Sequence, residues 1–468
     1  MKRRIPWFMF LTLIMVSCSQ GDVSEQHNIT ALKPSMHVNV EFVSEPQTNI
    51  LQYDTAWRWN APQIAVGDLT GDHYPEISFV AGAWVPSQRA AESEGVYYSH
   101  PVTFSWNGQT FELLKADWVG ISSYVSQVSV YRSQSIPIAL RITDIDQDGA
   151  NELIVGTGAM EFKGAVYIFQ WDGGRFVAEY SDYCLGAVSR IDEVNDGTEV
   201  VLSVSGRPTG ASPYDREMCP EVIQGTAEPT TGLYSLRATQ PNAYESHLLT
   251  LNNYLSTALV GNSEYLSSTY FVRVQSPGSN ELVDWSTRQV WHYADEQLSA
   301  GTLPLEIERP LVQMKTADLD GDQISEIVVL AAKEWRDYVD LADEDLLLWL
   351  VFQQENNAYQ LVYEGEVDFS SSRYSTKLFA VGDADNDGTD ELLASNGELY
   401  TWLDDHLELQ VNLSEAMGEE FCKGLESIYI GTVHNDGKNR IVFTARDASA
   451  TEFCPDQSYP RLYVVSLN

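Results

Sequence analysis

The stretch that decides the fold is Phe379-Ala-Val-Gly-Asp383-Ala-Asp385-Asn-Asp387-Gly-Thr-Asp-Glu391-Leu-Leu. Its carboxylates fall at positions 1, 3, 5 and 9 of a short loop, counted from Asp383, and apolar residues flank the loop on both sides. That spacing lets a tight turn place several oxygen atoms around a hard cation of calcium size. The motif therefore predicts a cofactor and, if it recurs, an architecture.

The loop recurs twice with all four carboxylates, and each copy runs into an aliphatic segment typical of a strand. A further copy keeps positions 1, 5 and 9 but has Thr70 at position 3, where a hydroxyl coordinates only weakly. We therefore predict three calcium sites and a weaker fourth, with these ligands: Asp144, Asp146, Asp148 and Glu152; Asp318, Asp320, Asp322 and Glu326; Asp383, Asp385, Asp387 and Glu391; and Asp68, Asp72 and Glu76.

Two other interpretations of the loop can be weighed. An EF-hand needs a bidentate Glu at position 12 and a helix on each side, but position 12 is Val155, Val329 or Ala394, and the flanks have no helical period. A metal-free turn is the simpler alternative, because Asp, Asn and Gly favour turns by themselves. Three copies with the same carboxylates favour the metal.

Two degenerate copies are predicted to carry no ion. The stretch 191–199 has Val194 at position 3 and is one residue short. The stretch 431–440 has lost most of its carboxylates and has Arg440 where the other copies have Glu. A guanidinium at that place can take over the charge of the missing metal.

Behind each hairpin comes an aromatic, alternating segment, and seven of these can be counted, at 102–106, 166–171, 233–236, 290–293, 348–352, 399–402 and 462–465. Only six acidic or degenerate turns precede them. We expect the missing turn in 270–283, as a shortened hairpin without metal ligands.

Seven units of two hairpins each, with no long helical pattern, predict an all-β protein: a seven-bladed β-propeller of four-stranded antiparallel blades over 36–468. The last unit shows only three strands, near 425–431, 439–446 and 461–467. The alternating segment 36–42 can supply the fourth, so that N- and C-terminal strands close the ring and remove exposed edges.

The loop resembles the repeats of the FG-GAP/VCBS family, whose relatives include the integrin α-subunit propellers. Phe379-Ala-Val-Gly-Asp383 and the following residues are similar to that motif almost letter for letter, and Ile64-Ala-Val-Gly-Asp68 is similar too. The resemblance covers about 60–468. It implies seven blades, with calcium in the hairpin between the first two strands of a blade, and the degenerate third and seventh blades and the fourth should lack the ion.

The N-terminus is typical of an export signal. A basic start precedes the apolar stretch 5–16, which is too short for a membrane anchor of about 20 residues. The residues before Cys18 resemble a bacterial lipobox with Met15 in place of the usual Leu, so we expect a signal over 1–17, lipidation at Cys18 and a flexible tether over 18–35. Ordinary signal cleavage is the alternative. Ser19 resembles an outer-membrane sorting signal.

Four further cysteines, Cys184, Cys219, Cys422 and Cys454, form an even set, which favours disulfides in an exported chain. Of three possible pairings, proximity favours Cys184–Cys219 and Cys422–Cys454, and free buried thiols are the alternative. The net charge of −39 favours solubility and repels nucleic acid. We expect membrane contact through the lipid anchor only.

The sequence contains no nucleophile elbow, zinc spacing, phosphate loop or dinucleotide fingerprint, so it predicts no catalytic residue. Three functions remain open: a calcium-stabilised binding or adhesion module with a protein or glycan ligand; a carbohydrate-active hydrolase or lyase with its site in the propeller channel; or a structural subunit of an envelope complex. A carboxylate pair with a His or Tyr on the channel face would favour the enzyme. We expect specificity in inserts at 85–100, 206–230 and 331–346.

Overall fold

The computed structural model divides the chain into two compact units, Met1–Ser35 and Met36–Asn468, and all described residues belong to the second. These residues are 36–45, 59–86, 95–114, 117–119, 128–129, 136–158, 165–182, 185, 187–194, 198–205, 232–251, 269–271, 280–284, 289–294, 297–302, 311–333, 346–355, 358–369, 378–419, 421–447 and 460–468.

The described strands pair into seven sheets, which are numbered here in chain order. Sheet 1 contains β2 (Trp59–Gly67), β3 (Glu76–Pro86), β4 (Gly95–Trp106) and β5 (Phe111–Leu113). Sheet 2 contains β8 (Ile136–Thr143), β9 (Glu152–Gly158), β10 (Val166–Trp171) and β11 (Arg175–Asp182). Sheet 3 contains β12 (Ala187–Val194), β13 (Glu199–Ser205), β14 (Gly232–Gln240) and β15 (Ala243–Leu251).

Sheet 4 contains β16 (Thr269–Phe271), β17 (Asn280–Asp284), β18 (Gln289–Ala294) and β19 (Gln297–Thr302). Sheet 5 contains β20 (Leu311–Ala317), β21 (Glu326–Ala332), β22 (Leu346–Glu355) and β23 (Ala358–Asp368). Sheet 6 contains β24 (Phe379–Gly382), β25 (Glu391–Ala394), β26 (Glu398–Leu403) and β27 (His406–Asn412). Sheet 7 contains β28 (Phe421–Thr432), β29 (Asn439–Asp447), β30 (Pro460–Leu467) and β1 (Val38–Val43).

The all-β prediction is confirmed, because the described part of the chain has one helix, α2 (Leu413–Met417), of five residues. The seven aromatic segments form the third strand of the seven sheets, and the hairpin expected in 270–283 is present as β16 and β17. No described helix has the length and apolarity needed to cross a membrane.

Two details of the sheets differ from the prediction. Two sheets have a fifth strand: β6 (Asp117–Val119) pairs in parallel with β11, and β7 (Val128–Ser129) pairs with β4. Much of the expected insert 85–100 is also strand, since β3 continues to Pro86 and β4 begins at Gly95. The backbones of Val85, Tyr97 and their neighbours pair in the β3–β4 ladder, which the loop-like composition of this segment concealed.

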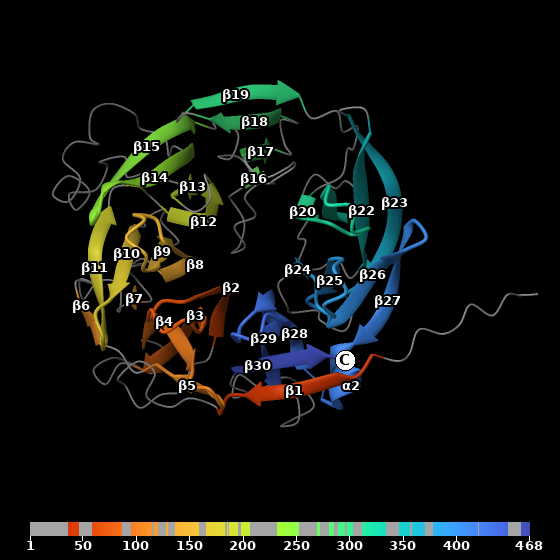
Figure 1. Ribbon diagram of the computed structural model, residues 1–468, viewed down its shortest axis with the longest axis horizontal. Helices are drawn as coiled ribbons and strands as arrows, with labels where there is room; N and C mark the ends of the chain where they lie inside the picture. Colours follow the sequence, from red (N-terminus) through yellow and green to blue (C-terminus); the bar gives the residue numbers. More distant parts are fainter. Residues whose placement is uncertain are drawn as a thin grey trace, which may run out of the picture. The chain divides into compact units, whose positions relative to one another are not determined.

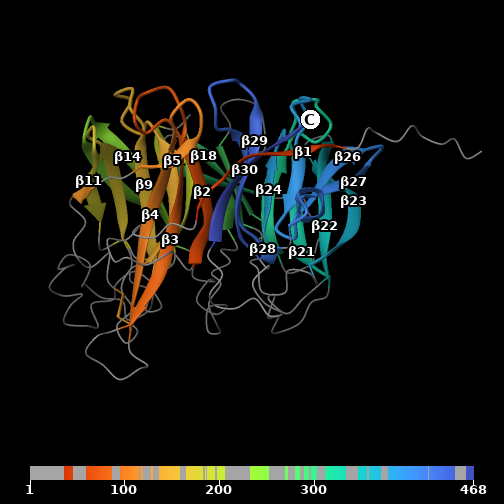
Figure 2. The same ribbon diagram turned by 90° about the horizontal axis from the view of Figure 1, so that it is seen from below.

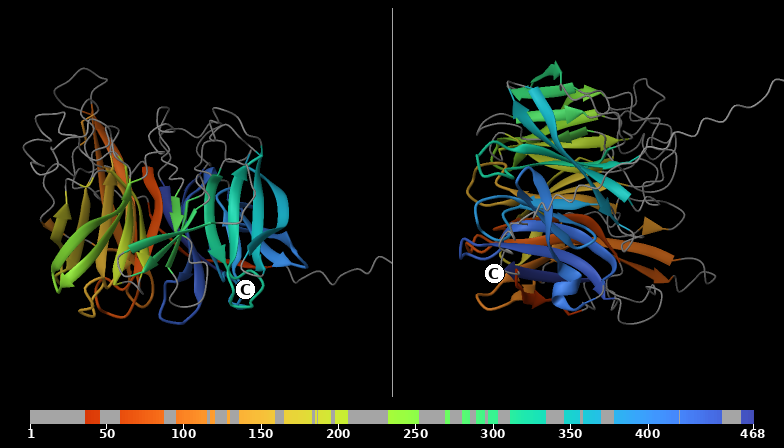
Figure 3. Two further views of the ribbon diagram at one scale, coloured as in Figure 1. Left: turned by 90° about the horizontal axis from the view of Figure 1, so that it is seen from above. Right: turned by 90° about the vertical axis from the view of Figure 1, so that its right-hand side faces the viewer.

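Consecutive sheets contact each other through their first strands, in the arrangement of a β-propeller. β2 contacts β8 and β28, β8 contacts β12, and β24 contacts β20 and β28. Sheet 4 is joined to its neighbours by contacts of β19 with β15 and of β16 with β20. Figure 1 shows these first strands on the inner side, and Figure 3 shows the strands of neighbouring sheets standing side by side.

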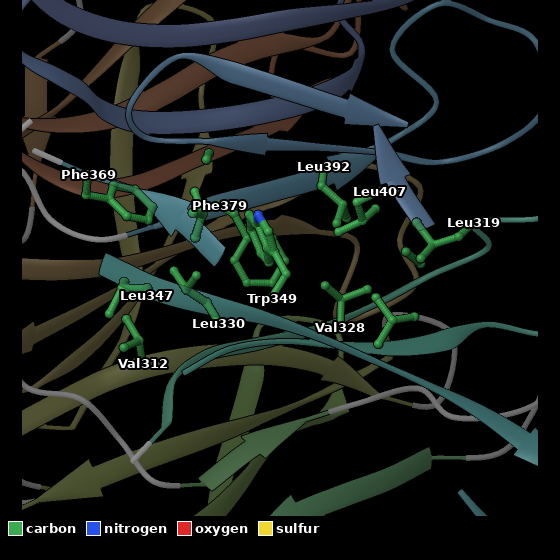
Figure 4. Packing of buried hydrophobic residues seen from close by; sticks show 14 of the residues in the cluster. Val312, Leu319, Val328, Leu330, Leu347, Trp349, Phe369, Phe379, Leu392 and Leu407 are labelled. Atoms are coloured by element: carbon green, nitrogen blue, oxygen red, sulfur yellow. The ribbon is translucent and has the colours of Figure 1, made fainter. Parts of the chain in front are cut away.

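The core consists of apolar layers between neighbouring sheets. Between sheets 5 and 6, the buried Trp349 of β22 meets Phe379 of β24 edge-on, with ring centroids 4.9 Å apart, and aliphatic residues such as Leu330 and Leu392 surround the pair (Figure 4). A similar layer joins sheet 7 to sheet 1, where Val464 packs in one cluster with Phe79 and Phe104. Burial of large side chains stabilises each layer by about 1.5–3 kcal/mol per residue.

The prediction that the two ends of the chain share a sheet is confirmed. β1 pairs antiparallel with β30, from Val38 opposite Leu467 to Val43 opposite Tyr463. Main-chain hydrogen bonds extend the pairing at both ends, as between His37 and Asn468. The N-terminal strand therefore completes the fourth position of sheet 7.

Close approach of the sheets explains the glycine that precedes Asp68 and Asp383. A Cβ atom at Gly67 would lie 2.4 Å from Cγ2 of Ile142 in sheet 2, and one at Gly382 would lie 2.8 Å from Cγ2 of Ile430 in sheet 7. The glycine lets the branched side chain of the next sheet lie against the backbone.

Several predictions concern residues outside the described ones. The signal 1–17, Cys18 and the tether 18–35 belong to this group, as do the inserts 206–230 and most of 331–346. Cys184, Cys219 and Cys454 are also outside, and of Cys422 only the backbone is described, within β28. The disulfide and lipidation predictions therefore stay predictions.

Candidate metal centres

The four acidic loops occupy equivalent places in four sheets. They join the first strand to the second in sheets 1, 2, 5 and 6, and the strand register pairs the residue before position 1 with position 9, as in Gly382 opposite Glu391. Figure 2 shows hairpin loops of several sheets together at the upper side of the view. The repeat thus places these carboxylates at the same end of neighbouring sheets.

Local hydrogen bonds shape each loop. One carboxylate oxygen of the position 9 glutamate, Oε2, accepts the main-chain N–H of position 2 at 2.6–3.0 Å in all four loops. The position 5 aspartate accepts the N–H of position 7, as in Asp387 with Thr389. The residues at positions 4 and 6 adopt positive φ, as at Asn386 (64°) and Gly388 (96°). Such turns form without metal, so they do not by themselves indicate an ion.

Three of the four loops gather their carboxylates into clusters. In each cluster the oxygen atoms of positions 1, 3 and 9 lie within 4.8 Å of one another; the three sets are Asp144, Asp146 and Glu152; Asp318, Asp320 and Glu326; and Asp383, Asp385 and Glu391. These are the three loops with all four carboxylates in the sequence. Of the predicted ligands, the position 5 residues Asp148, Asp322 and Asp387 stand in the loops but outside these sets.

The strongest indication of a cation is a pair of buried oxygen atoms without hydrogen-bond donors. Glu152 and Glu391 are completely buried, and the Oε1 atom of each has no hydrogen-bond partner. Asp318 Oδ1 is likewise buried without a partner. An unsatisfied buried carboxylate oxygen is costly. All donors of these clusters are oxygen, which is the ligand chemistry of calcium and magnesium.

The pKa values of the position 9 glutamates, with no ion bound, also favour a cation in these clusters. Burial, with added repulsion from Asp146, raises the pKa of Glu152 to about 8. Burial, with added repulsion from Asp385, raises the pKa of Glu391 to about 8, and burial raises the pKa of Glu326 to about 7. The sites therefore disfavour their own ionised form, and a bound divalent cation would reverse that preference.

The loop of sheet 1 differs from the other three. Glu76 is completely buried, but its Oε1 accepts hydrogen bonds from the hydroxyls of Thr70 (3.2 Å) and Ser105 (2.9 Å). Asp68, Asp72 and Glu76 form no cluster of the kind described above among the described residues. Hydroxyl donors here satisfy the oxygen that lacks a partner in Glu152 and Glu391. The fourth calcium site stays a prediction, with less support from geometry than the other three.

The two degenerate turns are shorter or differently charged. In sheet 3, Val194 pairs directly with Glu199, whereas Gly382 pairs with Glu391, so this turn is four residues shorter than the acidic loops and not one. In sheet 7, the register of Gly431 opposite Arg440 matches that of the acidic loops. Arg440 donates from Nη2 to Asp436 Oδ2 at 2.7 Å and from Nη1 to the Lys438 carbonyl at 2.9 Å. The expected guanidinium therefore lies within this turn.

Position 8 of the loop was missed by the sequence reasoning. Asn151 donates from Nδ2 to the Asp68 carbonyl at 2.8 Å, and Asn439 does the same to the Asp383 carbonyl. Asp390 accepts the N–H of Asp318 at 2.9 Å. Each contact joins a loop to position 1 of the preceding sheet. The recurrence of Asn or Asp at position 8 in three copies was the signal that could have revealed it.

Comparisons with known proteins assign no family to the chain. No family model matches the chain, and no curated protein sequence matches it. The resemblance to FG-GAP/VCBS repeats therefore rests on the loop motifs. Similar solved structures include Sqt1 of Saccharomyces cerevisiae, with 10% identity, 93% of this chain and 99% of that chain covered, and a TM-score of 0.43.

Two bacterial structures are similar with lower TM-scores and lower coverage of this chain. A putative 6-phosphogluconolactonase of Bacteroides fragilis shares 13% identity over 81% of this chain and 92% of that chain, with a TM-score of 0.42. A periplasmic gluconolactonase of Pseudomonas aeruginosa shares 13% identity over 74% of this chain and 84% of that chain, with a TM-score of 0.38. Likenesses at this level carry no conclusion about activity.

Proposed function

We propose that the chain is a calcium-stabilised, seven-bladed β-propeller of FG-GAP/VCBS type that acts as a binding or adhesion module at the bacterial envelope. The observation that carries the calcium part is the buried Oε1 atom of Glu152 and of Glu391, each without a hydrogen-bond donor inside a cluster of carboxylates. A calcium ion supplies the missing partner and offsets the repulsion between the carboxylates.

Calcium fits these loops better than magnesium. Arg440 occupies the equivalent turn of sheet 7, and its guanidinium contacts the position 5 carboxylate and the position 7 carbonyl. By analogy, an ion in the acidic loops would take the position 7 carbonyl as well as carboxylates at positions 1, 3, 5 and 9. Calcium accepts six to eight oxygen ligands in flexible geometry, whereas magnesium requires a near-ideal octahedron and keeps several waters.

The seven blades and the closed ring belong to the same proposal. Seven sheets follow one another along the chain, neighbouring sheets are in contact, and an apolar layer joins sheet 7 to sheet 1. Support for lipid anchoring at Cys18, and for outer-membrane sorting through Ser19, comes from the sequence alone. We expect Cys18→Ser to move the protein from the membrane fraction to the soluble fraction; unchanged fractionation would contradict lipidation.

One observation favours the enzyme alternative. The carboxylates of Asp192 and Glu193 lie on the first strand of sheet 3, and Tyr429 on the first strand of sheet 7 interacts electrostatically with Glu193. A carboxylate beside a Tyr is one part of the feature expected of a channel active site, a carboxylate pair with a His or Tyr; Asp192 and Glu193 are consecutive in a strand, so their side chains point to opposite faces. Turnover of a hydroxylated or glycosidic substrate that is lost in Glu193→Gln would support this alternative over a binding module. A subunit role in an envelope complex remains the third proposal.

Thermal unfolding tests the calcium proposal. The purified chain is melted in a chelator, in excess calcium, and in excess magnesium. We expect calcium to raise the Tm by mass action. Each site adds about 2.7 kcal/mol to the free energy of unfolding when the ligand concentration is 100 times the Kd. Magnesium should raise the Tm less. Identical melting curves in chelator and calcium, with no metal found in the purified protein, would refute the proposal.

A further inference from the structure

Two hydrogen bonds join the acidic loops of sheets 5 and 6. Asp390, at position 8 of the loop of sheet 6, accepts the N–H of Asp318 on Oδ2 at 2.9 Å, and its own N–H donates to the Asp318 carbonyl at 2.8 Å. Asp318 is the position 1 carboxylate of the cluster in sheet 5, and Asp390 directly precedes Glu391 of the cluster in sheet 6. One residue therefore holds the main-chain N–H and C=O of a proposed calcium ligand in the neighbouring sheet.

A second contact joins the same two loops. Thr389, at position 7 of sheet 6, donates to Asp387 Oδ1 from its main chain at 2.9 Å and from its hydroxyl at 2.6 Å. Its methyl group lies against Gly321, at position 4 of the loop of sheet 5, because a Cβ atom added there would come within 3.2 Å of Thr389 Cγ2. The two loops thus touch at two places, each beside a proposed metal ligand.

The residue type at position 8 follows the loop of the neighbouring sheet. In the three loops of full length that come after a sheet with an acidic loop, position 8 is an Asn or Asp bonded to position 1 of that sheet: Asn151, Asp390 and Asn439. Position 8 is Ser325 in sheet 5, which comes after the turn 272–279 without acidic residues. It is Pro75 in sheet 1, whose neighbour is sheet 7 with its Arg440 turn. The shorter turn of sheet 3 has no equivalent position.

Among the described residues, one of these three links joins two complete clusters. Asn151 connects the cluster of sheet 2 to the loop of sheet 1, which forms no such cluster, and Asn439 connects the cluster of sheet 6 to the turn of Arg440. Asp390 connects the clusters of sheets 5 and 6. The cluster of sheet 2 has no complete cluster in a neighbouring sheet, so it is a reference within the same chain.

An ion in one of two linked loops should favour an ion in the other. A bound ion fixes the carboxylates that it contacts, and the loop around them loses conformational freedom. Because Asp390 is bonded to Asp318 and adjacent to Glu391, an ion in either loop orders part of the other. The second ion then has less freedom left to remove, which gives positive cooperativity. By linkage, each site changes the affinity of the other by the same factor.

We propose that the calcium sites of sheets 5 and 6 bind their ions as a cooperative pair, and that Asp390 is the positioning residue that couples them. The site of sheet 2 binds its ion independently. The inference rests on the calcium sites proposed above and adds which of them act together. Sheets 5 and 6 therefore respond to calcium as one unit, over a narrower range of concentration than a single site allows.

Hydrogen exchange of the whole protein, measured by mass spectrometry at a series of calcium concentrations, tests the coupling. Peptides that cover 318–326, 383–391 and 144–152 report the three sites separately. We expect 318–326 and 383–391 to gain protection together, along a curve steeper than one-site binding, and 144–152 to follow a one-site curve of its own. One-site curves for both 318–326 and 383–391 would overturn the proposal.

Two matched glutamine variants each remove one site. Glu391→Gln removes a ligand of the sheet 6 site, and we expect it to raise the calcium concentration that half-protects 318–326 by about fivefold or more. Glu152→Gln removes the equivalent ligand in sheet 2 and should leave the 318–326 curve unchanged. The same 318–326 curve in both variants would contradict the proposal. So would tighter binding at 318–326 in Glu391→Gln, which is the result that repulsion between two ions predicts.

A third pair of variants tests Asp390 itself. Asp390→Ala removes the acceptor for the N–H of Asp318, and its control, Asn151→Ala, removes the corresponding link between sheets 2 and 1. We expect Glu391→Gln to lose its effect on 318–326 when combined with Asp390→Ala and to keep that effect when combined with Asn151→Ala. Asp390→Asn retains an acceptor oxygen and should restore the coupling. An effect of Glu391→Gln that persists beside Asp390→Ala would overturn the role of Asp390.

The same measurements separate the coupling from the calcium sites themselves. Exchange of β29 in chelator shows whether each variant is folded, and the unmodified protein needs no such control. Calcium-dependent protection of all three peptides, with a 318–326 curve that Glu391→Gln leaves unchanged, refutes the coupling and not the sites. No calcium-dependent protection in any of the three peptides refutes both.

Discussion

The hairpins that open sheets 6 and 7 have the same register but differ in the charge of the residue at position 9. In sheet 6, Glu391 stands opposite Gly382, is completely buried and has an Oε1 atom without a donor. In sheet 7, Arg440 stands opposite Gly431, is 7% exposed and donates to Asp436. One hairpin presents a cluster of carboxylates that can hold a cation, and the other contains a cation as a side chain.

This difference teaches what the turn requires. Both hairpins place a position 5 aspartate that accepts the N–H of position 7, at 2.9 Å from Thr389 and 3.0 Å from Lys438. The two hairpins differ in the group whose positive charge lies beside this aspartate. In sheet 7 it is the guanidinium of Arg440, and in sheet 6 it would be the bound ion that we propose. Sheet 7 also recruits Glu41 from β1, whose Oε1 lies 2.8 Å from Arg440 Nε. The internal cation thus links the turn to the N-terminal strand, which an ion in the loop of sheet 6 does not do.

The largest effect is expected from breaking the internal cation. Arg440→Met leaves Glu41 and Asp436 without this partner. Removal of one member of a fully buried ion pair costs about 3–5 kcal/mol, and we expect the lower part of that range because Asp436 is 43% exposed. We expect a large fall in Tm that is the same in calcium and in chelator. The control is Arg175→Met, whose exposed pair with Asp172 is worth under about 1 kcal/mol. A calcium-dependent effect of Arg440→Met would contradict the comparison.

The next effect concerns the acidic hairpin of sheet 6, for which we propose a bound calcium ion. Glu391→Gln removes a ligand, so it should lower the Tm in excess calcium. The free energy of unfolding should fall by roughly 2–3 kcal/mol, the contribution of calcium binding at this site. In chelator the wild-type chain must take up a proton at Glu391 to fold near neutral pH, because burial and Asp385 raise the pKa of this carboxyl to about 8. Glutamine is already neutral, so the variant should melt at or above the wild-type temperature. Glu419→Gln, at an exposed position after α2, is the control. A loss of equal size in both media would show that Glu391 is only a structural hydrogen-bond acceptor.

A smaller effect is expected where both hairpins meet. Gly382→Ala would place a Cβ atom 2.8 Å from Cγ2 and 2.9 Å from Cβ of Ile430, so sheets 6 and 7 must separate slightly. We expect a loss of about 1–3 kcal/mol, as for overpacking in a core, measured by urea unfolding. Gly174→Ala has no atom within 4 Å of its new Cβ and should change little. Equal stability of both variants would show that the sheets adjust freely.

A further effect, which needs no substitution, is the pH dependence of the protein in chelator. The pKa of Glu152 is about 8 in the folded chain and close to the ordinary value of 4.5 when unfolded. Between these pH values the folded state binds more protons than the unfolded state, so the free energy of unfolding falls as pH rises. In chelator we expect the Tm to decrease from pH 5 to pH 8, and in excess calcium this decrease should disappear. A chelator Tm that rises with pH would contradict the raised pKa.

The sequence predicts those parts of the molecule whose chemistry is local. The spacing of Asp383, Asp385, Asp387 and Glu391 was enough to place a hairpin between two strands, because a short loop has few ways to converge four carboxylates. The alternation of apolar and polar residues in 36–42 was enough to place β1 in the last sheet, because the last unit of the sequence was one strand short. The guanidinium of Arg440 was expected because its place in the motif is fixed.

Contacts that depend on register or on distant sheets could not be predicted. Ser105 satisfies Glu76 only because β4 lies beside β3, which no local pattern shows. The contact of Glu41 with Arg440 joins residues 399 positions apart. The third turn was misjudged in length because Val194 pairs directly with Glu199.

The pairing of β1 with β30 also sets the order in which the chain can fold. Asn39 and Ser466 are hydrogen-bonded across 427 residues, so closing this contact early would restrict nearly the whole chain before other contacts repay that entropy. The six sheets between them are built from neighbouring hairpins and can form as the chain emerges. β1 is synthesised before the other strands, but it cannot pair until β30 has been synthesised. A chain that stops before β30 leaves β1 without its partner strand.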